Sequence, residues 1–497
     1  MAIAFTPYST AAPLFGTKPS WLTSELDIQR IQAYQLYEQI YWTANDTFKI
    51  TFRGSNQLPI YVPSARTIVD TVDRFTAPEL GLSFVDATSA RADTADALAA
   101  KLAFRDLFAR ERFFSKFDGN KLYGIMRGDW IWHVTANPLK PQGSRISITS
   151  LDPAMYFPIT DPDDVDKLIG CHLVEQITTQ QGPRIRRLTY RKTLDSNGVP
   201  TGQITVEDAI FALDQWEGPQ GKPEKVLQQP TPLPPSITAL PVYHVPNTDN
   251  PGDPFGSSEI RGLERIMGAV NQTISDEDLT LAMEGIGQYI TDAPPPTDDQ
   301  GNVIGWQLGP GRVAQVPEGN MFQRVKGADS VVPYGDHYGR LLDALMTASA
   351  LSDVAVGRVA NQALASGVAL AIQLKPLLSK AGKKNTLITE VHNQMLFDLM
   401  TGWMPAYEST SFDNVLGQFT VGDPVPTDRA EKMSELNDML DRGVIDTQYY
   451  RDEMTKLGYE FPPDIAARIT AEQNSKAQTT ATGLGLNVPD TTGGTTG

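Results

Sequence analysis

The sequence predicts an α+β chain, because three different patterns follow one another along it. Apolar residues recur at three- and four-residue steps over the first 120 residues, which is typical of amphipathic helices. Between 122 and 243 the pattern changes to short β runs separated by Pro, Gly, Asn and Asp. From 257 onward, long helical patterns return, interrupted once by a short β-containing stretch. We therefore expect helices and a mostly antiparallel β part in separate stretches.

The length and composition are those of a globular protein with more than one compact unit. The chain has 497 residues, of which 40% are hydrophobic and 20% charged, and this length favours two to four units. No apolar run reaches the roughly 18 to 20 residues of a membrane helix. The first residues also lack a basic region followed by an apolar stretch, so we expect no secretory signal, no membrane and a start in the cytoplasm.

Few residues of the chain are suited to metal or cofactor chemistry. Cys171 is the single cysteine, which excludes an intrachain disulfide and a thiolate cluster, and we expect it to be buried. The five histidines show no HxxxH or HExxH spacing, so no zinc site is predicted. Neither G-x-x-x-x-G-K-[ST] nor G-x-S-x-G occurs. We expect no cofactor and no catalysis, although an enzyme that works through two carboxylates stays as a rival.

The net charge of −17 speaks against a protein that grips nucleic acid, since phosphate binding depends on clustered Lys and Arg. DNA as a passing cargo is compatible with this charge, because an acidic or mixed lining lets the polymer slide. The alternative is that acidity keeps a large subunit soluble, and composition does not choose between the two.

Several elements can be placed in the first half. Residues 1–20 read as an extended arm, and helices are predicted from 21, over 64–76 and over 93–117, with Thr23 or Ser24 as the first cap. Asp161, Asp163, Asp164 and Asp166 lack the Gly and Glu of a calcium loop, so a hairpin is predicted there. The Pro-rich stretch 218–241 is predicted to be an exposed loop.

The second half predicts two helices that carry a β tip. A helix should begin at Ser257 or Ser258, with Glu259 in its first turn, and run to about Gly285. Three prolines at 294–296 end any helix, and short β runs follow at 303–308 and 312–317. Helices are again predicted over 336–350 and 368–401. Such a stalk suits a ring with an axial opening better than a compact enzyme.

Four stretches of this half resemble the portal proteins of tailed phages, particularly the SPP1-like portal family. These are PVYHVPN followed by GSSEIRGLERIMGAVNQTISDEDL, then GPGRVAQVPEG, then SGVALAIQLKPLLSKAGKKN, and more weakly the helix–turn–helix of 428–459, in which Asp446 is a cap. The matching positions are Gly256, Ser258, Asn271, Ser366, Gly367, Ala369, Leu370, Pro376 and Lys380. The first half agrees with the family only in the order of its elements.

The resemblance implies a portal fold with a helical and β wing, an α-helical stem, a small α/β clip and a C-terminal helical crown. The implied boundaries are an arm at 1–20, a wing at 21–255 (helical 21–120, mostly β 121–245), a first stem helix at 256–287, a clip at 288–333, a second stem helix at 334–351, a channel loop at 352–366, a long wing helix and return at 367–426, crown helices at 427–475 and a disordered tail at 476–497.

It also implies roles for four groups of residues. The DNA-facing residues of the channel loop would be Arg358, Asn361 and Gln362, unless that loop is solvated or bridges subunits. The acidic stem lining would comprise Glu264, Asp276, Glu277 and Glu284, although an outward solvent face explains them equally well. The clip contacts to partners would be Trp306, Arg312, Phe322 and Arg324, with a fold-internal role for Trp306 as the alternative. Basic residues that pair with a neighbouring subunit or touch DNA would be Lys375, Lys380, Lys383 and Lys384.

The implied function is a ring of twelve subunits at one capsid vertex, through which double-stranded DNA is packaged and ejected. Its partners would be the terminase large subunit as motor, the head–tail adaptor, the major capsid protein and the scaffold. The chain would then reside in the virion, after assembly in the host cytoplasm. Another structural protein of the virion is the second reading.

Overall fold

The structure is a computed structural model, and it describes residues 21–44, 47–52, 57–161, 164–196, 198–217, 221–286, 288–304, 306, 317–325, 332–357, 367–422, 424, 429–456, 459, 465 and 468–472. The chain divides into two compact units, Met1–Pro424 and Val425–Gly497. Its named strands pair antiparallel, and most of them follow one another between Asp129 and Pro246, with helices before and after, so the fold class is α+β, as predicted. None of the described helices is long and apolar enough to cross a membrane.

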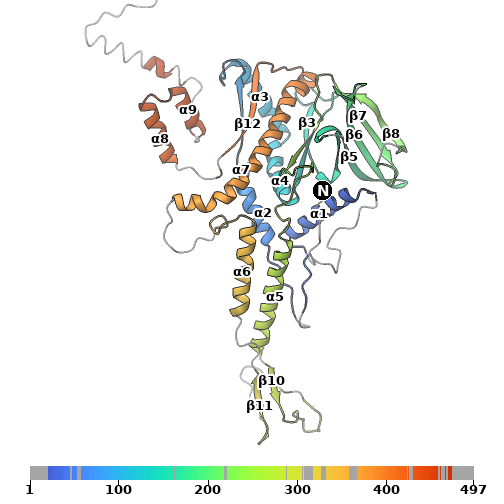
Figure 1. Cartoon of the computed structure of the whole chain (residues 1–497), viewed down its shortest axis with the longest axis vertical. Coiled ribbons are helices and arrows are strands. Elements are labelled where there is room, and N and C mark those ends of the chain that lie inside the picture. The colour runs from blue at the N-terminus through green and yellow to red at the C-terminus, as the bar shows by residue number, and fades with distance from the viewer. Residues whose placement is uncertain are drawn as a thin grey trace, which may run out of the picture. The chain divides into compact units, whose positions relative to one another are not determined.

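Four helices form the N-terminal part of the first unit (Figure 1): α1 Glu25–Tyr41, α2 Ser64–Phe75, α3 Ala95–Arg110 and α4 Phe113–Arg127. The hydroxyl of Ser24 accepts from the backbone N–H of Asp27 and caps α1. The single helix predicted over 93–117 is wrong. Arg112 adopts a left-handed backbone with φ of 53°, which separates α3 from α4. Helix α4 then runs through the first residues of the region predicted to be β.

The β part is antiparallel, as predicted, and most of it lies in two sheets with strand orders β4-β5-β6-β7-β8 and β3-β2-β9. The strands of these sheets are β2 Asp129–Ala136, β3 Ile146–Leu151, β4 Tyr156–Asp161, β5 Asp164–Thr179, β6 Gly182–Leu194, β7 Pro200–Phe211, β8 Lys225–Pro232 and β9 Val242–Pro246. Asp161 pairs with Asp164, so the acidic cluster belongs to the predicted hairpin. The exposed loop predicted over 218–241 is wrong in part, because β8 lies in it. β8 lies at the edge of its sheet, where one side of the strand has no neighbour to which its N–H groups would donate. Prolines at 230 and 232, which lack an N–H, are therefore tolerated there.

The central core of the first unit joins these helices and sheets to the second half of the chain. Phe113, Phe117, Trp130 and Trp132 pack there against α7, Gly367–Asp398. A separate two-stranded sheet, formed by β1 (Leu80–Asp86) and β12 (Val415–Val421), packs against this core. After α7 the helix widens into a π-helix, Leu399–Glu408, which ends at Ser409 with φ of 55°. The helix predicted over 368–401 is thus confirmed, with different winding at its end.

A further core holds the beginning of α5 (Glu264–Ile286) and the end of α6 (Val332–Ala348) against α2, α4 and α7. The turn before α5, α5, α6 with the residues just after it, and α7 contribute to this core Ile260, Leu263, Met267, Leu345, Leu351 and Leu377. The predicted helix start at Ser257 or Ser258 is wrong, because α5 begins only at Glu264. Gly262 has a φ of 84°, outside the helical range, so the helix starts after it. The hydroxyl of Ser258 does not cap α5 but donates to the carbonyl of Met126 at 2.5 Å.

The second unit contains α8 Arg429–Asp441 and α9 Thr447–Lys456. Gly443 between them has a φ of 69°, and Asp446 accepts from the backbone N–H of Tyr449 at 2.7 Å. The predicted helix–turn–helix with its Asp446 cap is confirmed. The predicted names and limits of wing, stem, clip and crown stay predictions.

Candidate functional site

Helices α5 and α6 lie side by side and run in opposite directions, with a two-stranded ribbon between them in the sequence (Figure 1). The ribbon pairs β10 (Gln288–Thr291) with β11 (Phe322–Val325), in the register from Gln288–Val325 to Thr291–Phe322. The chain therefore leaves a packed core through α5, forms a small β tip and returns to the same core through α6. This is the stalk that the sequence predicts.

The strands of the tip differ from those predicted. Of the run 303–308, Val303 makes an isolated bridge with Thr297, and 311–316, most of the second run, lies outside the described residues. The rings of Trp306 and Phe322 approach to 5.3 Å between centroids at 55°. Trp306 is half-buried, so its indole contributes to the packing of the tip itself. This contact supports the fold-internal reading of Trp306.

The other predicted tip contacts can be placed only in part. Arg312 lies outside the described residues. Arg324 belongs to β11, where its backbone pairs with Tyr289, and its side chain is not among the described atoms. A role of these two arginines in partner contact stays a prediction.

Two of the four predicted acidic lining residues are buried inside the subunit, which corrects that prediction. Asp276 is 7% exposed, and its Oδ1 accepts from the side-chain amides of Gln57 at 3.0 Å and Gln272 at 2.9 Å. Glu264 is 8% exposed, and burial raises the pKa of its carboxyl above the usual value. Glu277 is half-buried, and Glu284 lies in α5 with its side chain outside the described atoms.

Asp276 is buried because the chain before α2, Thr51 and residues 57–62 included, lies along α5. Three α5 side chains bind its backbone: Asn271 Oδ1 accepts from the N–H of Val62 at 2.8 Å, Ser275 Oγ from Ile60 at 2.9 Å and Gln272 Oε1 from Thr51 at 2.7 Å. Asn271 and Ser275 are fully buried. Sequence reasoning missed this role, although polar residues at i and i+4 on an otherwise apolar helix face are its signal.

Two of the four predicted basic residues pair within their own chain. Lys380 Nζ lies 2.8 Å from Oε2 of Glu259, and Lys384 Nζ lies 2.6 Å from Oε1 of the same carboxylate. Lys384 also donates to Asn247 Oδ1 at 2.7 Å, and Lys380 to the carbonyl of Ser349 at 2.7 Å. We call these residues, Glu259, Lys380, Lys384 and Asn247, together with the Ser349 carbonyl, the Glu259 cluster.

Glu259 and Lys384 are buried, and Lys380 is partly exposed. Burial alone would raise the pKa of the Glu259 carboxyl, but the charges of Lys384 and Lys380 outweigh it and hold that pKa below its usual range. The side chain of Lys384 is 4% exposed. Because Lys384 is buried and bound inside the subunit, the prediction that it pairs with a neighbouring subunit or touches DNA is corrected. Lys380 is also bound inside the subunit, but its side chain is 26% exposed, and for it this stays a prediction. Lys375 and Lys383 are exposed, and for them it stays a prediction.

The predicted DNA-facing residues Arg358, Asn361 and Gln362 lie outside the described residues. The described chain stops at Gly357, shortly after α6, and resumes at Gly367, where α7 begins. Both flanks are thus close in sequence to the Glu259 cluster.

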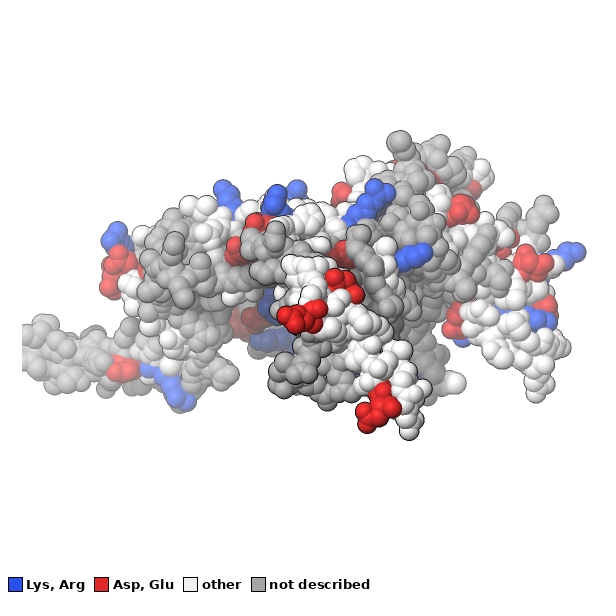
Figure 2. Space-filling model, turned by 90° about the horizontal axis from the view of Figure 1, so that it is seen from below, with Lys and Arg blue, Asp and Glu red and all other residues white. Residues whose placement is uncertain are grey.

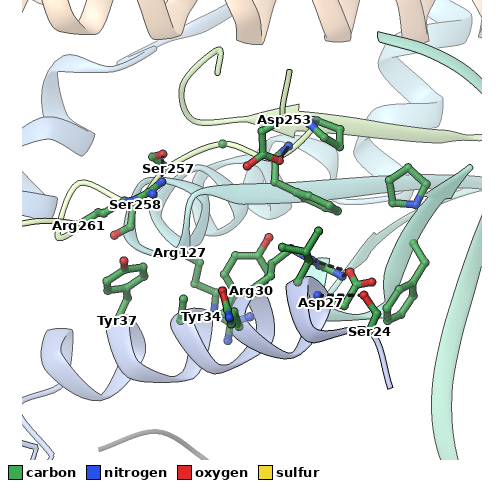
Figure 3. Close-up of a pocket in the computed structure, with 18 of the residues that line it drawn as sticks. Ser24, Asp27, Arg30, Tyr34, Tyr37, Arg127, Asp253, Ser257, Ser258 and Arg261 are labelled. Atoms are coloured by element: carbon green, nitrogen blue, oxygen red, sulfur yellow. Dashed lines mark hydrogen bonds and ion pairs between the residues drawn. The ribbon is translucent and has the colours of Figure 1, made fainter. Parts of the chain in front are cut away.

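A cavity of about 440 Å³ lies between α1, β4 and the segment 252–261 (Figure 3). Arg30 from α1 donates to Asp27 Oδ1 at 2.8 Å and to the carbonyl of Pro153 at 2.9 Å, and its guanidinium lies 4.1 Å from the ring centroid of Phe255. Arg127 pairs with carboxylates of Glu38 and Asp152 outside the lining. The two arginines are therefore neutralised within the chain.

A buried carboxylate stands behind this cavity. Asp129 accepts from the Tyr34 hydroxyl at 2.5 Å and from the backbone N–H of Gly256 at 2.7 Å, and it lies 2.7 Å from His244 Nε2. Burial, and then the charge of Asp129, raises the pKa of Tyr34 well above its usual value, so the hydroxyl stays a donor. The arrangement fixes α1 to β2 and β9 and presents no activated nucleophile.

Charge is mixed on the face seen from the tip of the helix pair. Figure 2 shows Asp and Glu interspersed with Lys and Arg there, and the described residues of this face form no continuous basic patch. This distribution agrees with the net charge of −17 in disfavouring a surface that grips nucleic acid.

Neither a family model nor a curated protein matches this chain. Among solved structures, it is similar to a chain of the virion of a native gene transfer agent particle, with 11% identity and a TM-score of 0.44, over 86% of this chain and 94% of that one. It is also similar to a chain from the neck of the native particle computed with C12 symmetry, with 12% identity and a TM-score of 0.41, over 80% of this chain and 95% of that one. At such identities, the function has to be argued from the chain's own residues.

Proposed function

We propose that the chain is a subunit of a portal ring, the channel through which double-stranded DNA enters and leaves a tailed-phage-type particle. The observation that carries the proposal is the α5–ribbon–α6 stalk, whose two helices are rooted in one core. A stalk of this kind exposes much surface for its size, which is useful when neighbouring copies or partners cover it. The portal-like stretches fall in sequence on β9, on the turn before α5 and α5 itself, between β10 and β11, on the first part of α7 and, more weakly, on α8 and α9.

In this proposal each part has a mechanical role. Twelve copies form a closed ring with the helix pairs around the axis, and the tips meet first the terminase large subunit and later the head–tail adaptor. The first unit contacts the major capsid protein and, during assembly in the host cytoplasm, the scaffold. The finished ring occupies the portal vertex of the virion.

The net charge of −17 supports a channel that lets DNA slide rather than one that holds it. Because Glu264 and Asp276 are buried in the subunit, any acidic lining on the stem has to come from other residues, with Glu277 and Glu284 as the remaining candidates. The loop 352–366, with Arg358, Asn361 and Gln362, would supply the polar contacts to the passing duplex.

The rival enzyme would need two carboxylates that face one another across an accessible cleft. In the cavity beside α1, Asp27 is bound to Arg30, and Asp253 accepts from the backbone N–H of Phe255 at 3.0 Å. Both carboxylates are thus engaged locally, and we propose no catalytic role for the chain.

Replacing residues 288–325 by a short Gly–Ser linker tests the proposal in a packaging system that depends on this chain. We expect the shortened chain to fold and to form rings but to yield particles without DNA, because the motor loses its contact. The matched control is Leu139→Ser, which changes a side chain 93% exposed in the loop between β2 and β3, and should package normally. Normal DNA content with the shortened chain would contradict the proposal.

A further inference from the structure

The Glu259 cluster connects four segments that are far apart in the sequence. Asn247 follows β9, Glu259 lies in the turn before α5, Ser349 directly follows α6, and the two lysines lie one turn apart on α7. We propose that Lys380 and Lys384 are positioning residues, which act through Glu259 and Ser349 to hold both stalk helices at a fixed angle to α7. The role for a DNA channel rests on the proposed function, whereas the mechanical link does not.

The first step of the argument is the end of α6. The last carbonyls of a helix have no partner within the helix, and they carry its negative dipole end. Here the Ser349 carbonyl accepts from Lys380 at 2.7 Å, so a cation from α7 closes α6. Ala350 follows with a left-handed φ of 60°, which a non-glycine residue adopts at a cost. Backbone N–H groups of Ala350 and Leu351 close the carbonyls of Thr347 and Met346, and the Lys380 contact adds a link from α7 at the Ser349 carbonyl.

The second step is that one carboxylate serves both lysines. Lys380 binds Oε2 of Glu259 and Lys384 binds Oε1, and the spacing of four residues on α7 places both ammonium groups on one helix face. The side chain of Glu259 is 7% exposed and that of Lys384 4%. Removing Glu259 would leave the buried ammonium of Lys384 without its carboxylate. Removing Lys380, whose side chain is 26% exposed, would leave the Glu259–Lys384 pair in place but would break the link from α7 to the Ser349 carbonyl.

The third step of the argument is that the Glu259 cluster lies close in the sequence to both ends of the segment between α6 and α7. Ser349 lies just before that segment, and Lys380 lies on the helix that follows it. A tilt of α5 or α6 relative to α7 must either carry the cluster along or break it. In a portal ring, the cluster would thus set where the loop 352–366 enters and leaves the channel.

Hydrogen–deuterium exchange of the full-length chain tests the proposal, with Lys380→Met as the variant. Lys383→Met is the matched control, since it makes the same chemical change at an exposed position on the same helix. We expect exchange in peptides covering 257–275 and 332–351 to speed up about tenfold or more, while β5, β6 and β7 stay as in the wild type. The control should match the wild type throughout.

Two results would overturn the proposal. Unchanged exchange in 257–275 and 332–351 would show that the cluster positions nothing, and an equal rise over all peptides, the five-stranded sheet included, would show a contribution to general stability alone. Should Lys380→Met fail to fold, Glu259→Gln and Lys380→Arg replace it. The first should loosen the same peptides, and the second, which keeps the charge, should loosen them less.

The same experiment separates this inference from the portal assignment. Exchange is measured on the purified chain, whatever its role in a particle. A localised rise in a chain that forms no rings would support the cluster and contradict the portal.

Discussion

The hydroxyl of Tyr243 in β9 donates a hydrogen bond of 3.0 Å to Oδ2 of Asp398, the last residue of α7. The other carboxylate oxygen accepts from the side-chain amide of Gln394 at 2.9 Å. Burial raises the pKa of Asp398 to about 6, although both hydrogen bonds act to lower it. A buried carboxyl thus links α7 to the three-stranded sheet where α7 passes into the π-helix.

Replacing Asp398 by Asn should stabilise the chain increasingly as the pH rises. The folded-state pKa lies above the unfolded value, so the stabilising contribution of this group is present at low pH and is lost as the pH rises through about 6. Asn stays neutral throughout, and the advantage of Asp398→Asn should grow by about 1 to 3 kcal/mol between pH 4 and pH 8. Urea unfolding across this range measures it, and a difference that does not change with pH would be contrary to the account.

The stability that His392 contributes should depend on pH in the opposite sense to that of Asp398. Burial lowers the pKa of His392 to about 4, and the neutral ring accepts from Trp132 Nε1 at 3.0 Å. Because the folded-state pKa lies below the unfolded value, this stabilisation is present above pH 6.5 and is lost as the pH falls towards 4. In His392→Gln, roughly 2 to 3 kcal/mol of the pH dependence in this window should disappear. The control is His337→Gln on the exposed face of α6, and equal curves for the two variants would refute the assignment.

Ala350→Gly should stabilise the chain by about 0.5 to 1 kcal/mol, because Gly adopts the φ of 60° found there without strain. The comparison is Ala344→Gly, an exposed position inside α6, where Gly should cost about 0.5 to 1 kcal/mol. Thermal unfolding of both variants gives the two signs. The same loss of stability at both positions would mean that the turn after α6 is not strained.

Asp276→Ala should cost about 1 to 3 kcal/mol, since it removes one buried acceptor from the side-chain amides of Gln57 and Gln272. Asp278→Ala, two residues on and exposed, should change the free energy of unfolding by less than about 0.5 kcal/mol. Chemical denaturation distinguishes the two. If the two substitutions have equal effects, Asp276 is a surface residue that a channel lining could use.

Local patterns of the sequence account for most helices and strands, including the stalk and the α8–α9 pair. These local patterns fail where contacts with residues far away in the sequence determine the structure. The turn before α5 is held by Asn247, Lys380 and Lys384, and none of these contacts is visible in the helical period of 257–285. The carboxylate of Asp276 looks solvent-facing in sequence because Gln57, whose side-chain amide donates to it, lies more than 200 residues away. Hydrogen-bonded polar residues on an apolar helix face are the warning that such a distant contact exists.

Electron microscopy of the purified full-length chain tests the portal proposal most directly. The account predicts rings of twelve subunits with a central opening, and the α5–α6 pairs arranged around that opening. A uniform monomer at high concentration, or an assembly without an axial opening, would contradict it.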